Sequence, residues 1–224
     1  ENSRAAIKAA VAAGYGIEID LQLSADGAAM VFHDYALDRL TDETGSIRLR
    51  SVSDLRAIPL KGGDEGIPTL TEALDMIAGQ VPLLIELKDQ DGGMGPNVGP
   101  LEKATAEAIR TYHGAVAVMS FNPNSVAMMA DLLPDVPRGI VTEAYNYDAW
   151  PLPKATCDRL REIPDYERTG ACFISHDVAD LDRGRVAEIK ALGAMICCWT
   201  VRSASQEAKA RKVADNITFE GYLA

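Results

Sequence analysis

The sequence predicts an α/β fold, a (β/α)8 barrel that lacks its first strand within the 224 residues given. Predicted strands and helices alternate from end to end, with no linker long enough to divide the chain. Near-continuous apolar runs, such as residues 81–87 and 194–199, are typical of parallel strands buried on both faces. Seven parallel strands are counted, whereas a closed barrel needs eight. We therefore expect the first strand to lie upstream of Glu1.

The seven predicted strands are short apolar runs bounded by turn residues. They are Gly16 to Leu23, Pro82 to Leu87, Ala115 to Phe121, Arg138 to Val141, Ala171 to Ser175, Ala194 to Val201 and Asn216 to Phe219. An open doubly wound sheet is the alternative architecture. No glycine-rich phosphate turn follows any of the strands, which favours the barrel.

The predicted helices mostly begin at a capping residue or a proline, and several end at a glycine. They are Asn2 to Ala13, Thr69 to Ala78, Leu101 to Tyr112, Asn122 to Leu133, Lys154 to Arg168, Leu181 to Leu192 and Ser203 to Val213. Residues 1–224 are thus expected to form one domain, which is an ordinary length for such a barrel.

Composition narrows the class of protein. The chain has 22 Lys and Arg against 33 Asp and Glu, a net charge of −11, and 47% hydrophobic residues, which excludes a disordered chain. No apolar run approaches the roughly 18 to 20 residues that cross a bilayer, so no transmembrane segment is expected. The acidic balance argues against nucleic-acid binding, because phosphate backbones are held by basic patches. An anionic small substrate would need a local cation.

The four cysteines, at 157, 172, 197 and 198, have no spacing typical of a zinc site. Buried free thiols are the expected state, which favours a reducing compartment. We therefore expect a cytoplasmic protein.

Two acidic residues lie on one face of the first predicted strand. Glu18 and Asp20 are two residues apart, so both side chains leave the strand on the same side. Asp26-Gly27 predicts a two-residue hairpin turn, in which paired residues have numbers summing to 53 and Asp20 faces His33. A bulge would shift this register by one residue.

The next strand adds Glu86 and Lys88 on one face, near its carboxyl end. Carboxylates directed into an apolar barrel are costly unless they are neutralised. Together with Glu18 and Asp20, Glu86 makes an oxygen-rich site suited to one divalent ion, Ca²⁺ or Mg²⁺. Lys88 is the local cation, and a metal with a lysine and a histidine suits phosphoryl chemistry.

Each of these residues also has an ordinary structural interpretation. Glu18 and Asp20 could be solvated or salt-bridged, Asp34 could cap a turn, and Lys88 could simply neutralise Glu86. The positions at strand ends, where barrel enzymes keep their chemistry, favour a functional site.

Several segments resemble the glycerophosphodiester phosphodiesterase family. They are Glu1-Asn2-Ser3, Gly16-Ile-Glu-Ile-Asp-Leu-Gln-Leu-Ser-Ala-Asp-Gly, Val31-Phe-His-Asp, Leu37-Asp-Arg-Leu-Thr, Ile67-Pro-Thr-Leu-Thr-Glu-Ala-Leu and Leu84-Ile-Glu-Leu-Lys. The resemblance implies a TIM barrel with a small insertion after the second strand, about residues 35–66. It is most specific in the first 90 residues.

The resemblance also implies roles for individual residues. Glu18, Asp20 and Glu86 resemble the family's metal ligands, His33 resembles one of its two catalytic histidines, and Lys88 resembles its phosphate-contacting lysine. The other histidine and its neighbouring arginine would lie just before Glu1. The implied activity is metal-dependent hydrolysis of a small glycerophosphodiester to glycerol 3-phosphate and an alcohol.

Four further residues are predicted to contact the substrate. Phe121 and Trp199 end their strands and could form an apolar wall, although core packing explains each equally well. Tyr145 lies in an aromatic segment, with Tyr147 and Trp150, that could be a selectivity loop or an ordinary packed loop. Glu220 stands at the rim where the family usually has an aspartate.

Two other functions stay open at this point. A lysophospholipase D-like phosphodiesterase would use the same site, and a non-catalytic barrel would only bind a polyol phosphate. A homo-oligomer is also an open possibility.

Overall fold

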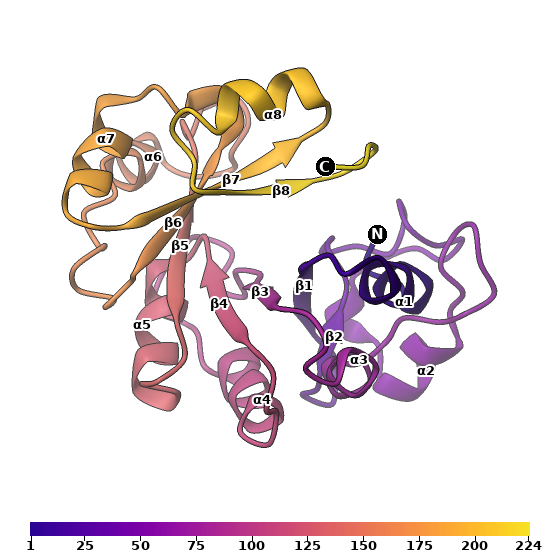
Figure 1. The fold of residues 1–224 in the computed structure, drawn as a ribbon. Helices are drawn as coiled ribbons and strands as arrows, with labels where there is room; N and C mark the ends of the chain where they lie inside the picture. The colour runs from indigo at the N-terminus through magenta and orange to yellow at the C-terminus, as the bar shows by residue number, and fades with distance from the viewer.

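Eight strands form a single curled sheet in the computed structural model, which describes residues 1–224 (Figure 1). Their order across the sheet is β2-β1-β3-β4-β5-β6-β7-β8, and all neighbours are parallel except β1 and β2. The strands are β1 (Ile17–Leu23), β2 (Ala29–Val31), β3 (Leu83–Leu87), β4 (Val116–Ser120), β5 (Arg138–Thr142), β6 (Phe173–Asp177), β7 (Met195–Val201) and β8 (Asn216–Phe219). Each of the seven predicted parallel strands is present.

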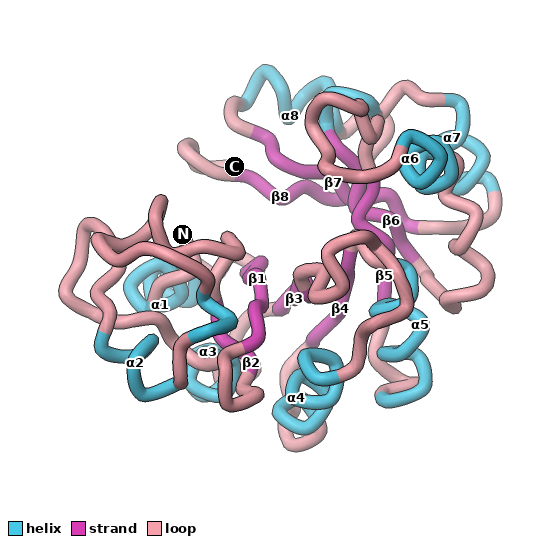
Figure 2. Tube along the Cα trace, turned by 180° about the vertical axis from the view of Figure 1, so that it is seen from behind, coloured by secondary structure: helices cyan, strands magenta, loops and turns pink.

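Helices lie on the outside of the curled sheet (Figures 1 and 2). They are α1 (Arg4–Ala13), α2 (Val52–Ala57), α3 (Leu70–Ile77), α4 (Pro100–Ile109), α5 (Pro123–Leu132), α6 (Lys154–Arg161), α7 (Gly184–Ala191) and α8 (Ala204–Ala210), with short 3-10 turns η1 (Ile47–Leu49) and η2 (Val178–Asp180). Two large apolar clusters, one beside β1, β3 and β4 and the other beside β6 and β7, join the helices to the sheet.

The sheet is open between β8 and β1, which do not pair with each other. Both chain ends lie on this open side (Figure 1), and the Tyr15 hydroxyl donates to the Ala224 carbonyl over 2.9 Å. Seven parallel strands with one open side agree with the predicted count. Closure into a barrel by a further strand stays a prediction.

Local sequence explains why α3 forms where it does. The Thr69 hydroxyl accepts a hydrogen bond from the backbone N–H of Glu72, and the Glu72 carboxylate accepts one from the backbone N–H of Thr69. This capping box satisfies two of the free N–H groups at the helix start. Leu70, Leu74 and Ile77 then fall on one face and are buried against the sheet.

Two helix predictions need correction. Helix α6 ends at Arg161 instead of continuing to Arg168, because Pro164 cannot continue a helix and Ile163 before it has a left-handed φ of 46°. Helix α2 was not predicted, because only six residues form it and their apolar pattern is too short to recognise.

The hairpin register is also different from the one predicted. Leu21 pairs with Val31 and Leu23 with Ala29, so paired numbers sum to 52 and Asp20 lies opposite Phe32. The cause is a three-residue loop with Gly27 at φ 87°, a turn that ends in a glycine bulge. Phe32 therefore lies opposite Asp20, and His33 is the next residue along the chain.

Residues 35–66, the predicted insertion, follow β2 and contain η1 and α2. Their apolar residues Leu37, Ile47 and Leu55 pack with Met30 and Phe32 of the β2 segment in a separate small core. That the whole chain is one domain stays a prediction. None of the helices has the length and apolar character needed to cross a bilayer.

Candidate active site

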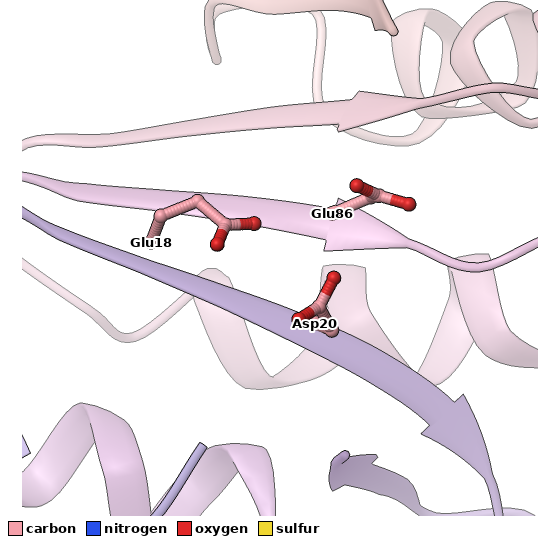
Figure 3. Close-up of side chains that lie close together, drawn as sticks. All are labelled: Glu18, Asp20 and Glu86. Carbon is pink, nitrogen blue, oxygen red and sulfur yellow. The ribbon is translucent and has the colours of Figure 1, made fainter. Parts of the chain in front are cut away.

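Three carboxylates gather on neighbouring strands of the sheet (Figure 3). Asp20 of β1 is paired in register with Glu86 of β3, and Glu18 lies two residues earlier on the same side of β1. One oxygen of each carboxylate lies within 4.8 Å of those of the other two. Asp20 and Glu86 are only 5% and 6% exposed, so parallel pairing concentrates negative charge in a buried place.

Lys88 partly neutralises this charge. Its Nζ lies 2.7 Å from Asp20 Oδ1 and 2.7 Å from Glu86 Oε1. Burial alone would lower the pKa of this ammonium group, but the charges of Glu86 and Asp20 outweigh burial and raise it. Lys88 is therefore charged at neutral pH, and it bridges the two strands.

One lysine does not balance three carboxylates. Burial raises the pKa of Glu18 well above its usual value, and the charges of Asp20 and Glu86 add to that effect. Burial also raises the pKa of Glu86, with Lys88 opposing and Asp20 adding to the rise. With all three carboxylates ionised, the cluster and Lys88 would carry a net charge of −2.

This group of residues fits a divalent cation. Carboxylate oxygens are the ligands that Ca²⁺ and Mg²⁺ prefer, and a double positive charge would balance the excess negative charge. No cysteine or histidine belongs to the cluster, which makes it a poor match for a soft metal.

The start of the chain holds Asp20 in place. The Asn2 side chain donates from Nδ2 to Asp20 Oδ2 over 2.8 Å, and its Oδ1 accepts from the Asp20 backbone over 3.1 Å. Both contacts fix the carboxylate on its strand and leave Oδ1 for Lys88. Sequence reasoning gave Asn2 no role, because a contact between residues 18 positions apart leaves no local pattern.

His33 belongs to a chain of charged groups at the edge of the site. Its Nδ1 lies 2.6 Å from Asp34 Oδ1, and Arg39 donates two hydrogen bonds to the same carboxylate. Arg39 also pairs with Glu1. The Arg39 contact lowers the pKa of Asp34 to about 2, so Asp34 is an anion that orients the imidazole ring and leaves Nε2 free.

A cavity of about 360 Å³ joins His33 to the carboxylate cluster. It is lined by His33, Asp34, Tyr35, Glu86, Lys88, Asp89, Met94, Phe121, Glu143, Trp150 and Trp199. The volume is in the range of small-molecule sites. The structure thus brings five of the predicted residues, His33, Glu86, Lys88, Phe121 and Trp199, to one cavity, with Glu18 and Asp20 beside it.

Aromatic rings form one wall of this cavity. Phe121 lies between the two tryptophans, with ring centroids 5.1 Å from Trp150 and 5.6 Å from Trp199. The Trp199 indole N–H donates to the Ser175 carbonyl over 3.0 Å, and Trp150 donates to a Glu143 carboxylate oxygen. These hydrogen bonds fix the planes of both indoles.

Two predicted substrate contacts are not found at the cavity. Tyr145 is fully buried and donates to the Val141 carbonyl over 3.3 Å, so it supports Phe121 and Trp150 from behind. Glu220 is exposed and pairs with Arg202 at 2.7 Å. Its carboxylate has a surface partner and lies outside the cavity lining.

Six further residues line the cavity and were missed as site residues or left undecided: Asp34, Tyr35, Asp89, Met94, Glu143 and Trp150. Asp89 accepts from the backbone of Gly92 and Met94 and from Asn122, and so shapes the glycine-rich loop that follows β3. Glu143 and Trp150 come from the segment after β5. Their aromatic and acidic composition was the only signal, and it does not show which side chain turns inward.

Open α/β sheets and barrels place their sites at the carboxyl ends of parallel strands, and this sheet brings together a cluster of carboxylates and a lysine, groups that suit phosphoryl chemistry. The fold and the site together place the protein in the class of hydrolytic α/β enzymes. The model of the glycerophosphoryl diester phosphodiesterase family matches residues 1–216, and the chain belongs to this family of phosphodiesterase enzymes.

Individual relatives agree with this assignment. The chain is 27% identical over 204 residues to a glycerophosphodiester phosphodiesterase of Bacillus subtilis, covering 84% of this chain and 67% of that protein. It is 29% identical over 160 residues to one of Caldanaerobacter subterraneus, covering 67% of this chain and 64% of the relative, slightly less than two thirds of its length.

A solved structure is also similar. It is a phosphodiesterase of Oleispira antarctica in complex with the product sn-glycerol-3-phosphate, 26% identical, with a TM-score of 0.78 and coverage of 96% of this chain and 85% of that one.

The charge excess in the cluster predicts how Glu18→Gln affects stability. Below the ordinary glutamate pKa of 4.5, Glu18 is protonated in both the folded and the unfolded state. As pH rises past 4.5 the unfolded chain loses this proton first, so the stability of the wild type falls until the raised folded-state pKa is passed. Glutamine does not ionise, so the variant does not lose stability in this way as pH rises.

We expect Glu18→Gln and the wild type, both freed of metal by a chelator, to melt together at pH 4. At pH 8 the variant should melt at least about 3 °C higher, since about 1 kcal/mol shifts the Tm of a chain of this size by about 2–4 °C. Glu107→Gln, at an exposed position of α4, is the matched control and should show no such trend. A variant that melts lower than the wild type at pH 8 would contradict the electrostatic account.

Proposed function

We propose that this protein hydrolyses glycerophosphodiesters to glycerol 3-phosphate and an alcohol. The observation that carries the proposal is one cavity lined by Lys88, Glu86 and a histidine oriented by a carboxylate, with Glu18 and Asp20 of the acidic cluster beside it. The family and the product complex of the Oleispira relative support the same substrate class.

The acidic cluster is proposed to hold one divalent cation, Ca²⁺ or Mg²⁺, through Glu18, Asp20 and Glu86. When bound, such an ion supplies positive charge to phosphoryl oxygens and to the developing transition state. The cluster fits this role because its donors are all carboxylate oxygens that lie close together and carry more charge than Lys88 balances.

Lys88 and His33 are proposed to do the remaining chemistry. The Lys88 ammonium, positioned by two ion pairs, stabilises the negative charge that grows on the phosphoryl group. His33 exchanges protons through Nε2, because Asp34 occupies Nδ1 and fixes the ring. His33 is proposed to donate a proton to the departing alkoxide, a step that needs a general acid.

The proposal is tested by an assay of the full-length natural protein, since the second histidine is predicted to lie upstream of Glu1. We expect Mg²⁺- or Ca²⁺-dependent release of glycerol 3-phosphate from glycerophosphocholine, with a loss of at least about 10²-fold in Glu86→Gln. Hydrolysis of lysophosphatidylcholine but not of glycerophosphocholine would indicate the lysophospholipase D alternative. Binding of glycerol 3-phosphate without turnover of either ester would indicate the non-catalytic barrel.

The role of His33 is tested by changing the leaving group. If His33 protonates the departing alkoxide, His33→Ala should lose about 10²- to 10⁴-fold in turnover of glycerophosphocholine. It should lose much less on a glycerophosphoryl nitrophenyl ester, because nitrophenolate leaves without a proton.

Asp20→Ala is the comparison variant for this test. It should reduce kcat/KM for both esters together, since charge stabilisation is needed whatever group departs. Equal losses for His33→Ala on the two esters would show that His33 is not the general acid.

A further inference from the structure

The cavity has two chemically different parts. Lys88, Glu86 and His33 lie on one side, where the proposed function places the phosphoryl group. Another part of the wall contains three aromatic rings and the Glu143 carboxylate. We call this part, made by Phe121, Trp150, Trp199 and Glu143, the ammonium pocket. The lining is completed by Asp34, Tyr35, Asp89 and Met94.

Glu143 has no cationic partner in the structure. No Lys, Arg or His nitrogen forms an ion pair with it, whereas two other carboxylates of the lining have such a partner, Asp34 with Arg39 and Glu86 with Lys88. Its carboxylate is half-buried and receives the indole N–H of Trp150. Burial raises the pKa of Glu143, and the charge of Asp177 adds to this effect. A carboxylate held against aromatic rings is costly unless a cation joins it.

The rings of the ammonium pocket also have no cation of their own. The nearby Tyr147 shows the contrast, because Lys154 Nζ and the Arg161 guanidinium lie 5.1 and 5.4 Å from its ring centroid. No such side chain stacks on Phe121, Trp150 or Trp199. Their faces are therefore free for a cation that comes with the substrate.

We propose that the ammonium pocket binds a quaternary ammonium group on the leaving alcohol, so that the preferred substrate is a glycerophosphodiester of a choline-type alcohol. This inference rests on the proposed function and names the substrate within it. Aromatic faces attract a cation through the ring quadrupole, and a weakly hydrated trimethylammonium group enters an aromatic cage at little desolvation cost. Glu143 supplies the opposite charge.

Other alcohols fit this wall less well. A primary ammonium group needs hydrogen-bond acceptors for its three N–H bonds, and the ammonium pocket offers one carboxylate and three rings. A long apolar alcohol would bury Glu143 without a cation. A glycerol or inositol would leave its hydroxyl groups against the rings without partners.

Intrinsic fluorescence tests the pocket without any turnover. Trp150 and Trp199 are the only two tryptophans of the chain, and both line the cavity. We expect tetramethylammonium to change the tryptophan emission in a saturable way at millimolar concentration. The neutral alcohol 3,3-dimethylbutanol, in which carbon replaces the charged nitrogen of choline, should bind more weakly.

Glu143→Gln keeps an acceptor for the Trp150 N–H and should weaken tetramethylammonium binding by about fivefold or more. Glu107→Gln, which removes an exposed carboxylate from α4, is the matched control and should bind like the wild type. Equal binding of tetramethylammonium and 3,3-dimethylbutanol would overturn the proposal, as would a Glu143→Gln variant that binds the cation as well as the wild type.

The kinetic test uses glycerophosphocholine and its carbon isostere, the 3,3-dimethylbutyl ester, in the full-length protein. We expect kcat/KM to favour the choline ester by about 10-fold or more, and Glu143→Gln to reduce this ratio by about fivefold. Because the variant and the wild type are compared on the same two esters, the difference in leaving-group acidity cancels.

The outcomes separate the two proposals. Hydrolysis of both esters at a ratio that Glu143→Gln leaves unchanged would refute the ammonium pocket and leave the proposed function intact. Hydrolysis of neither ester, under conditions where the folded protein binds divalent metal, would refute the proposed function, and the substrate inference would fall with it.

Discussion

The site depends on the unbalanced charge between β1 and β3. Parallel pairing of Asp20 with Glu86 brings two carboxylates together in the sheet, and Glu18 adds a third. Buried carboxylates at this density are unfavourable unless cations join them. Lys88 forms ion pairs with Asp20 and Glu86 and so reduces the repulsion between their carboxylates. It leaves an excess negative charge that one divalent ion would balance.

The surrounding structure holds this charge in a fixed geometry. Asn2, at the start of the chain, hydrogen-bonds to the Asp20 carboxylate. At the end of the hairpin, Arg39 holds the Asp34 carboxylate, which in turn contacts the His33 ring. These supports come from loops and chain ends, whereas the three carboxylates themselves come from strands. Rigid strands place the carboxylates, and the flanking polar contacts select their orientation.

The strands and the acidic cluster could be predicted from the sequence because both depend on local pattern. Alternation along a strand fixes that Glu18 and Asp20 share a face, and parallel order brings Glu86 beside them. The hairpin register was wrong by one residue, since Asp-Gly is compatible with loops of two and of three residues. His33 nevertheless lines the cavity, because it directly follows Phe32, the residue opposite Asp20 at the end of the hairpin.

The aromatic wall was harder to predict. The sequence shows several aromatic residues after β5, but only tertiary packing decides that Trp150 turns inward and that Tyr145 is buried beneath it. The Glu143 to Trp150 contact spans seven residues of irregular backbone, for which no periodicity exists. Sequence reasoning therefore identified the carboxylates, Lys88 and His33 better than it identified the aromatic wall of the cavity.

The central claim is that Glu18, Asp20 and Glu86 jointly bind one divalent cation. The most direct measurement is a crystal structure of the protein grown or soaked with Mn²⁺, with anomalous scattering used to locate the ion. The account predicts one strong anomalous peak in contact with all three carboxylates, and its loss in Glu86→Gln. A peak bound elsewhere, or none at these carboxylates at millimolar Mn²⁺, would contradict it.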